Sequence, residues 1–257
     1  MNDVTKRQLS KMREDWDSRA RENARHYVDS SKTDWSDEEF FASGELAVER
    51  EVLSDMTNIC QGKHPSQMRV LEIGCGAGRV TRALARVFGQ VYAVDVSGEM
   101  VKRARQAVKP YRRRVFIFRN NGRDLRAIPN RQFDFAFSTV VFQHIPSRDV
   151  IENYVREAYR LLRPGALFKF QVQGDVAVES DAEDTWLGVP FSDEQAVEMA
   201  QRCGFEPRYR VNAGTQYFML WFFKPADAPA PPGFLRRRLN AVHRRLIAKD
   251  DHGQTQR

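Results

Sequence analysis

A glycine-rich turn beside two acidic side chains is the part of the sequence best suited to binding chemistry. Gly74, Gly76 and Gly78 follow an apolar run with the spacing G-x-G-x-G. Such glycines let a ligand approach the backbone closely. Glu72 lies inside the preceding apolar run, where a charge is costly unless it is paired or stands at the mouth of the strand. Asp95 ends the next apolar run, and a carboxylate there can accept hydrogen bonds from ribose hydroxyls.

The spacing of this turn differs from that of dinucleotide-binding proteins. Their fingerprint is G-x-G-x-x-G, and its last position is occupied by Arg79 in this chain. The motif alone is a weak signal, so the elements around it must decide its meaning.

Strand and helix patterns alternate around the turn. Short apolar runs bounded by turn residues predict strands, and longer amphipathic runs predict helices. Strands are expected at 70–73, 91–94, 115–118, 133–139 and 167–172, with helices at 79–88, 97–108 and 148–162. A helix at 192–203 and an antiparallel hairpin of strands at 206–211 and 216–223 follow. We therefore predict an α/β fold with a doubly wound, mostly parallel seven-stranded sheet, a terminal antiparallel hairpin and an N-terminal helical extension.

The composition divides the chain into four segments. An N-terminal helical cap, an α/β domain with an acidic insertion, a proline-rich linker and a basic helical tail are expected at 1–62, 63–224 (insertion 174–200), 225–233 and 234–257. Within the cap, one helix is expected at 3–28. A second helix is expected from Ser36, where Glu39 completes a capping box, to about Cys60.

The ordered set of motifs resembles the class I S-adenosylmethionine-dependent methyltransferases. The resemblance rests on the glycine turn 72–78, the acidic strand end 94–100, the fourth strand 133–139 and the turn 161–167 before the fifth strand. It covers roughly Arg69 to Pro225, which corresponds to the expected α/β domain. The terminal hairpin also fits this family, whereas dehydrogenases with a similar start lack it.

The resemblance implies that the cofactor is S-adenosyl-L-methionine. The implied cofactor-binding residues are Glu72, Gly74, Cys75, Gly76 and Gly78 at the methionine end, Asp95 at the ribose, Val96, Met100, Asn121 and Gly122 at the adenine, and Thr139 after the fourth strand. After the third strand the family often has Gly-Asp-Ala. This chain has Asn120-Asn121-Gly122, and Asn120 or Asp124 is an alternative to Asn121. Glu72 as a purely structural anchor and Met100 as a core residue also stay open.

Methyl transfer from a sulfonium mainly requires alignment of donor and acceptor, with removal of a proton where the acceptor carries one. His144, after the fourth strand, is the predicted catalytic base because imidazole titrates near neutral pH. The alternative is that His144 bonds a backbone group and shapes the loop. The spacings of histidine and cysteine fit no metal site.

Charge is distributed unevenly along the chain, which has a net charge of +7. Residues 102–126 hold ten basic residues and one acidic residue, and 234–257 hold seven and two. Residues 174–200 hold eight acidic residues and no basic one. The first basic segment is interpreted as a solvated face or a docking surface. The tail is interpreted as a contact for an anionic membrane surface or a protein partner.

Several classes of protein are excluded or disfavoured. The longest apolar run, 217–223, is too short for a transmembrane helix, and the charged N-terminus shows no secretory signal. Cys60, Cys75 and Cys203 are widely spaced and are expected to be reduced thiols in a cytoplasmic protein, with a peripheral membrane location left open. The motifs of DNA methylation are missing, because Ser138-Thr-Val-Val stands where an Asn/Asp-Pro-Pro-Tyr/Phe motif would lie.

The sequence thus predicts an enzyme that transfers a methyl group from S-adenosylmethionine to oxygen or nitrogen of a small or medium-sized acceptor. A metabolite, a sugar or a lipid precursor fits this description. The alternatives are an RNA methyltransferase and a non-catalytic domain that binds the cofactor and regulates another protein. The sequence decides neither the acceptor nor the oligomeric state.

Overall fold

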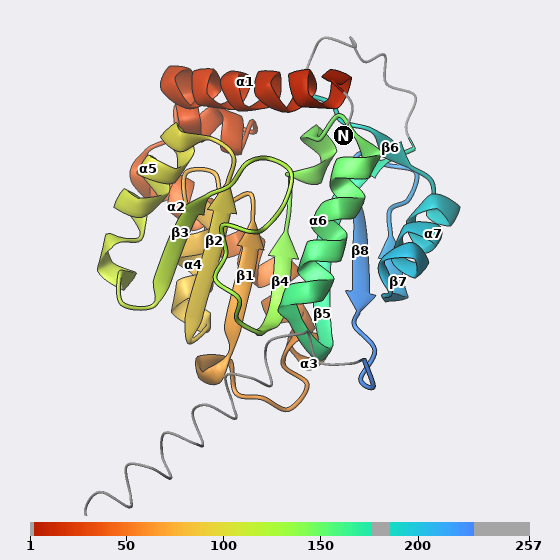
Figure 1. Cartoon of the computed structure of the whole chain (residues 1–257). Helices are drawn as coiled ribbons and strands as arrows, with labels where there is room; N and C mark the ends of the chain where they lie inside the picture. The colour runs from red at the N-terminus through yellow and green to blue at the C-terminus, as the bar shows by residue number, and fades with distance from the viewer. Residues whose placement is uncertain (1–2, 176–185, 229–257) are drawn as a thin grey trace, which may run out of the picture.

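A central sheet with helices on both faces forms the body of the molecule (Figure 1). The computed structural model describes residues 3–175 and 186–228. The strand order is β3-β2-β1-β4-β5-β8-β7, and β6 pairs with the end of β5. The five strands from β3 to β5 along this path are parallel, whereas β8 is antiparallel to β5 and to β7. The predicted fold class is confirmed.

The elements lie close to their predicted positions. The strands are β1 (Arg69–Ile73), β2 (Gln90–Asp95), β3 (Val115–Arg119), β4 (Phe133–Ser138), β5 (Leu162–Gly174), β6 (Pro190–Phe191), β7 (Glu206–Val211) and β8 (Phe218–Phe223). The helices are α1 (Asp3–Val28), α2 (Asp37–Glu51), α3 (Met56–Cys60), α4 (Arg79–Val87), α5 (Gly98–Ala107), α6 (Arg148–Leu161) and α7 (Asp193–Cys203). Short 3-10 turns are η1 (Leu53–Asp55), η2 (Pro65–Gln67), η3 (Lys109–Tyr111) and η4 (Phe142–His144).

The core lies in two layers because successive strand residues point to opposite faces of the sheet. In β1, Leu71 and Ile73 pack with α6 and α7, whereas Val70 packs on the other face with α2, α4 and α5. The largest fully buried side chains are all phenylalanine. Such strands, apolar on both faces, are typical of parallel sheets covered by helices.

The N-terminal cap differs from its prediction in two places. Helix α1 is kinked at Asn23, whose backbone (φ −157°, ψ 81°) is not helical and whose side chain accepts a hydrogen bond from the His26 backbone N–H. The second helix ends at Glu51 instead of continuing to Cys60. There the buried Lys169 side chain of β5 donates to the Glu51 carbonyl oxygen at 2.6 Å. A local hydrogen bond thus accompanies the kink of α1, and a tertiary contact accompanies the end of the second helix.

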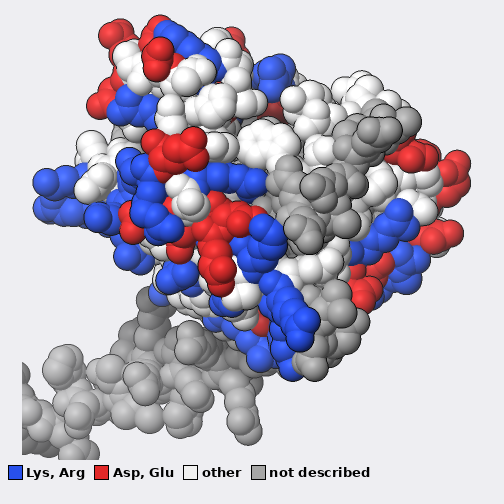
Figure 2. Space-filling view, turned by 90° about the horizontal axis from the view of Figure 1, so that it is seen from above, with Lys and Arg blue, Asp and Glu red and all other residues white. Residues whose placement is uncertain are grey.

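Helix α1 lies across the carboxyl ends of the parallel strands (Figure 1). Lys and Arg side chains gather at the left edge of Figure 2, the side on which α5 lies in Figure 1. The exposed basic residues of α5 and the segment after it are Lys102, Arg103, Arg105, Lys109, Arg112, Arg113 and Arg119. The basic tail lies outside the described residues, as does most of the linker. No helix among the described residues combines the length and the apolar character needed to span a bilayer.

One buried carboxylate ties together the amino ends of three strands. Asp134 of β4 accepts hydrogen bonds from Lys63 Nζ at 2.8 Å, from the Arg69 backbone N–H of β1 at 2.8 Å and from Arg163 Nε of β5 at 3.0 Å. Because Asp134 is only 6% exposed, these partners replace the water that it loses on folding.

Replacing Asp134 by Ala should lower the free energy of unfolding by about 2 kcal/mol, since an N–H and two cations lose their partner. Urea denaturation measures this loss. The exposed Asp227 provides the matched control, and Asp227→Asn should change stability by less than about 0.5 kcal/mol. Equal effects of the two substitutions would show that the Asp134 contacts do not stabilise the fold.

Candidate functional site

A cavity lies at the carboxyl ends of β1, β2 and β4, with α1 forming part of its wall. The predicted site residues that line it are Glu72, Gly74, Cys75, Gly76, Asp95, Val96, Met100, Thr139 and His144. Gly78, Asn121 and Gly122 are not among its lining residues.

The glycine turn is shaped by positive φ angles and close contacts. Gly74 has φ 78°, and a Cβ atom there would lie 2.3 Å from Val141 Cγ2. Gly76 has φ 49°, and its Cβ would lie 2.8 Å from Val28 Cγ2 at the end of α1. A side chain at either position would therefore force the cavity wall apart. Gly78 instead lets α4 approach α5, because its Cβ would lie 3.0 Å from Ala104 Cα.

Asp95 holds the turn against the end of β2. Its Oδ2 atom accepts a hydrogen bond from the Gly76 backbone N–H at 2.8 Å, and its Oδ1 atom accepts one from Ser97 N–H at 2.9 Å. Burial raises the pKa of Asp95 to about 6. A carboxylate offers about four acceptor positions, so the side chain can still receive hydroxyl donors from a ligand.

Glu72 and Arg79 lie in the wall of the same cavity. Glu72 is 3% exposed, and burial raises its pKa to about 8. Its Oε2 atom and the Nε atom of Arg79 have no hydrogen-bond partner among the described residues. Buried polar atoms are rarely left in this state. The side chains of Glu72 and Arg79 are complementary to the amino and carboxylate groups of an amino acid.

Arg79 is not among the predicted site residues, and its only signal in the sequence is its position, where a dinucleotide fingerprint has glycine. Arg79 begins α4, where a positive charge opposes the helix dipole. Its Nη1 atom lies 3.1 Å from Asp29 Oδ2, just after α1, and 3.2 Å from Ser43 Oγ on α2. These contacts tie both cap helices to the glycine turn.

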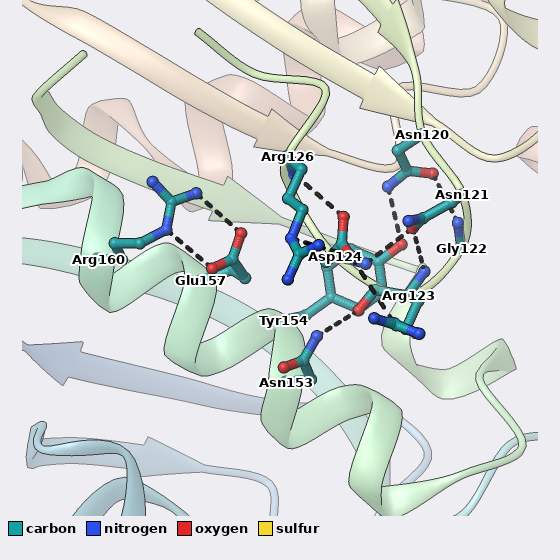
Figure 3. A network of polar contacts seen from close by, with 10 residues as sticks. All are labelled: Asn120, Asn121, Gly122, Arg123, Asp124, Arg126, Asn153, Tyr154, Glu157 and Arg160. Atoms are coloured by element: carbon teal, nitrogen blue, oxygen red, sulfur yellow. Dashed lines mark hydrogen bonds and ion pairs between the residues drawn. The ribbon is translucent and has the colours of Figure 1, made fainter. Parts of the chain in front are cut away.

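The loop after β3 corrects the prediction for the adenine end (Figure 3). Asn121 is exposed, and its Oδ1 atom accepts hydrogen bonds from the backbone N–H groups of Arg123 and Asp124 at 2.8 and 2.9 Å. Asn121 thus shapes the loop. Asn120 lines the cavity instead, and its Nδ2 atom donates to the Tyr154 hydroxyl of α6 at 2.8 Å. The alternative residue Asn120 therefore replaces Asn121 as the candidate adenine contact.

Two other residues of this loop stay outside the cavity lining. Gly122 is buried, and a Cβ atom there would lie 3.1 Å from Val96 Cγ2 and 3.2 Å from Met12 Cε. Asp124 is buried beside Arg123 and Arg126, each 3.7 Å away (Figure 3). Gly122 thus packs against Val96 and Met12, which line the cavity.

His144 lines the cavity and lies among aromatic rings. It is 3% exposed, and its ring centre is 5.1 Å from those of Trp16 and Trp186. Its Nδ1 atom bonds the Trp186 carbonyl oxygen, and its Nε2 atom is 3.4 Å from Gln143 Nε2. The backbone contact expected under the alternative interpretation of His144 is therefore present.

The wall beside His144 joins α1 to the acidic insertion, through Trp186. The guanidinium of Arg19 lies 5.0, 6.0 and 5.3 Å from the ring centres of Trp16, Tyr27 and Trp186. Asp17 also fixes α1, because its Oδ1 atom accepts from Ser97 Oγ at the start of α5. Aromatic residues of the cap and of the insertion thus meet at the cavity. Residues 176–185 of the insertion lie outside the described residues.

Comparison with known proteins identifies the kind of domain that contains this site. Residues 71–170 match the family model described as Methyltransferase domain. The ubiquinone biosynthesis O-methyltransferase of Xanthomonas oryzae pv. oryzae (strain PXO99A) is 34% identical over 97 residues, 38% of this chain and 39% of that protein. The malonyl-[acyl-carrier protein] O-methyltransferase of Enterobacter lignolyticus (strain SCF1) is 35% identical over 106 residues, 40% of this chain and 38% of that protein. The matches thus span about two fifths of the length of these relatives.

The solved structures agree with this assignment at the level of the fold. Magnesium protoporphyrin IX methyltransferase (ChlM) from Synechocystis PCC 6803 with bound SAM has a TM-score of 0.62 to this chain. The two are 15% identical, and the match covers 84% of this chain and 97% of that one. Residues 71–170 therefore match a methyltransferase domain, and the fold is that of S-adenosylmethionine-dependent methyltransferases.

Proposed function

We propose that the protein transfers a methyl group from S-adenosylmethionine to an oxygen or nitrogen atom of a small or medium-sized acceptor. The observation that carries this proposal is the cavity in which the glycine turn, Asp95 and the Glu72–Arg79 pair meet. The names of the relatives, both O-methyltransferases, favour oxygen as the accepting atom. The acceptor would be a metabolite, a sugar or a lipid precursor.

The residues of the cavity fit the chemical groups of this cofactor. Asp95 would accept the ribose hydroxyls, and Asn120 would contact the adenine edge. The Glu72 carboxylate would hold the amino group, and Arg79 would hold the carboxylate at the methionine end. The partnerless atoms Oε2 of Glu72 and Nε of Arg79 support this assignment, because such a ligand would satisfy both. The bound cofactor supplies an electrophilic methyl group.

The protein's own task is then alignment and proton removal. Trp16, Tyr27 and Thr139 line the cavity together with His144, and would position the acceptor. His144 would take the proton of a hydroxyl acceptor as the methyl group is transferred. A nearby aromatic wall that excludes water would strengthen the interactions of the reacting groups.

A second candidate function is methylation of RNA. The exposed basic surface of α5 favours it, because phosphate contacts supply much of the affinity for nucleic acid. Binding that weakens steeply with salt, and that is lost when Lys102 and Arg103 are replaced by Ala, would support this alternative. A domain that binds the cofactor and only regulates another protein would bind it without turnover.

The Asp95→Ala variant should bind S-adenosylhomocysteine at least tenfold more weakly, because two charge-assisted hydrogen bonds are each worth roughly 1.5–3 kcal/mol. Isothermal titration calorimetry measures the change, and Asp227→Asn serves as the control. Unchanged affinity would remove Asp95 from the cofactor site.

Cofactor binding should strengthen as pH rises from 6 to 8. With a pKa of about 8, Glu72 is mainly protonated in the free protein at neutral pH and must lose its proton to pair with an ammonium group. Below pH 8 this coupling weakens binding by up to about tenfold per pH unit. Titrations at pH 6, 7 and 8 should show proton release on binding in the wild type. Glu72→Gln should bind more weakly at pH 8 and lose most of this pH dependence between 7 and 8.

The stability of the Glu72→Gln variant shows whether a change in its binding reflects a change in folding. Burying the Glu72 carboxyl, whose ordinary pKa is 4.5, favours its protonated form, so the wild type loses stability as pH rises from about 4.5 towards 8. Glu72→Gln should therefore unfold at no lower urea concentration than the wild type at pH 8. A pH dependence of binding that Glu72→Gln retains in full would contradict the assignment.

His144→Ala should lower turnover by about a hundredfold, in line with the typical contribution of a general base. Its affinity for S-adenosylhomocysteine should stay within a few fold of the wild type. Steady-state kinetics with a responsive acceptor would measure this, and His64→Ala, at an exposed position, is the matched control. Turnover that does not change would eliminate His144 as the base.

A further inference from the structure

A chain of side-chain amides connects the end of β4 to His144, and its first hydrogen bond fixes its direction. The Val140 backbone N–H can only donate, and it donates to Gln171 Oε1 at 3.2 Å. Gln171 must therefore direct its amide nitrogen the other way. That nitrogen donates to Gln143 Oε1 and lies 3.5 Å from the Gln216 carbonyl oxygen, which can only accept.

The orientation of Gln143 follows from that of Gln171. Since Oε1 of Gln143 accepts from Gln171, its amide nitrogen is the atom that faces His144 Nε2, at 3.4 Å. An amide nitrogen has no acceptor capacity, so His144 Nε2 must carry a lone pair. The contact is long for a hydrogen bond and therefore weak, which allows another donor to replace it.

The other end of the chain selects the same form of the imidazole. His144 Nδ1 bonds the carbonyl oxygen of Trp186, which can only accept, so Nδ1 must carry the proton. Two backbone groups of fixed polarity, the Val140 N–H and the Trp186 C=O, thus specify one tautomer. In a neutral imidazole, one nitrogen donates and the other accepts.

Packing prevents the ring from exchanging its two nitrogens. The edge-to-face contact with Trp16 and the tilted contact with Trp186 enclose the imidazole, which is 3% exposed. The segment behind it is fixed as well, because Gly188 N–H donates to the Gln143 carbonyl at 2.5 Å and Val189 N–H to the Ile145 carbonyl at 3.2 Å. A rotation of the ring would break the bond to Trp186.

The series of side-chain amides begins at a strained residue beside the glycine turn. Val140 has φ 56°, which is rare for a β-branched residue and costs of order 1–3 kcal/mol. Its N–H bond to Gln171 holds this conformation, and the following residue, Val141, packs where a side chain at Gly74 would lie. The glutamines therefore link the cofactor turn to the histidine. Such strain is often concentrated at functional sites.

We propose that Gln143 and Gln171 are positioning residues that hold His144 as its Nδ1–H tautomer, with the Nε2 lone pair ready to receive the proton of the acceptor. This inference rests on the proposed methyl transfer. The proton of an acceptor hydroxyl, which replaces the Gln143 amide, passes to Nε2 while the oxygen–methyl bond forms and the sulfur–methyl bond breaks. The products are the methyl ether, the neutral thioether and an imidazolium that still donates its Nδ1 proton to the Trp186 carbonyl.

Nitrogen NMR of the histidine rings tests the proposal on the free protein without any substrate. The chain has five histidines, and the spectrum of His144→Ala identifies the signals of His144. The wild type, at a pH where His144 is neutral, should show a protonated Nδ1 and an unprotonated Nε2. A proton on Nε2 in that neutral form would overturn the proposal, whatever the activity of the enzyme.

Gln171→Glu should reverse the direction of hydrogen bonding along the series of amides, with almost no change in side-chain shape. A carboxylate can accept from Val140 N–H but cannot donate to Gln143, so Gln143 should turn its oxygen towards His144 Nε2. That nitrogen should then carry a proton, and kcat should fall about tenfold while the KM for the cofactor changes less than twofold. Gln201→Glu, at an exposed position of α7, is the matched control and should change neither property.

Gln143→Leu provides a second route if Gln171→Glu fails to fold. Removal of the amide takes away the donor that faces Nε2, so part of the neutral His144 should carry its proton on Nε2 and kcat should fall. Nitrogen shifts and a kcat equal to those of the wild type would overturn the assignment of Gln143. Nitrogen shifts of His144 that stay the same in Gln171→Glu would overturn the assignment of Gln171. A wild type with the expected tautomer but no methyl transfer would instead contradict the proposed function and leave the tautomer assignment standing.

Discussion

The site depends on the hydrogen bonds by which the end of β2 holds the glycine turn. The Val94 carbonyl accepts the N–H groups of Gly74 and Cys75 at 2.8 and 2.9 Å, and the Asp95 carboxylate accepts that of Gly76. The neighbouring parallel strands β1 and β2 bring these groups to one edge of the sheet. The glycine turn and the acidic end of β2, which both line the cavity, are therefore joined by hydrogen bonds. Ligands of open α/β sheets bind at this edge.

The N-terminal cap packs against the same glycine turn and the residues that follow β2. Val28 packs against Gly76, Asp17 bonds Ser97 after β2, and Asp29 pairs with Arg79 after the glycine turn. Helix α1 therefore contacts both ends of the candidate cofactor site and, through Trp16, the histidine. The kink at Asn23 lets the helix make these contacts, since the chain changes direction between Trp16 and Val28. A ligand bound in the cavity would be enclosed partly by residues outside the α/β domain.

The sheet could be predicted from the sequence because its strands are buried on both faces, which leaves short apolar runs such as 133–139 between turn residues. The glycine turn and Asp95 could be predicted because their chemistry depends on local spacing. The prediction for the adenine end named Asn121, with Asn120 only as an alternative. The two adjacent asparagines look alike in sequence, and only the loop conformation decides which one lines the cavity. The end of α2 at Glu51 and the contacts of Arg79 depend on distant segments, which a local pattern does not record. The kink of α1 coincides with a local hydrogen bond from His26 N–H to Asn23, which the spacing of apolar residues does not reveal.

The central claim is that the cavity binds the cofactor and passes its methyl group to a small molecule. Incubation of the protein with methyl-labelled S-adenosylmethionine, in parallel with a fractionated metabolite extract and with purified RNA, tests this claim most directly. The account predicts label in a small-molecule fraction and its loss when Asp95 is replaced by Ala. Label found only in RNA, or in no fraction despite cofactor binding, would contradict it.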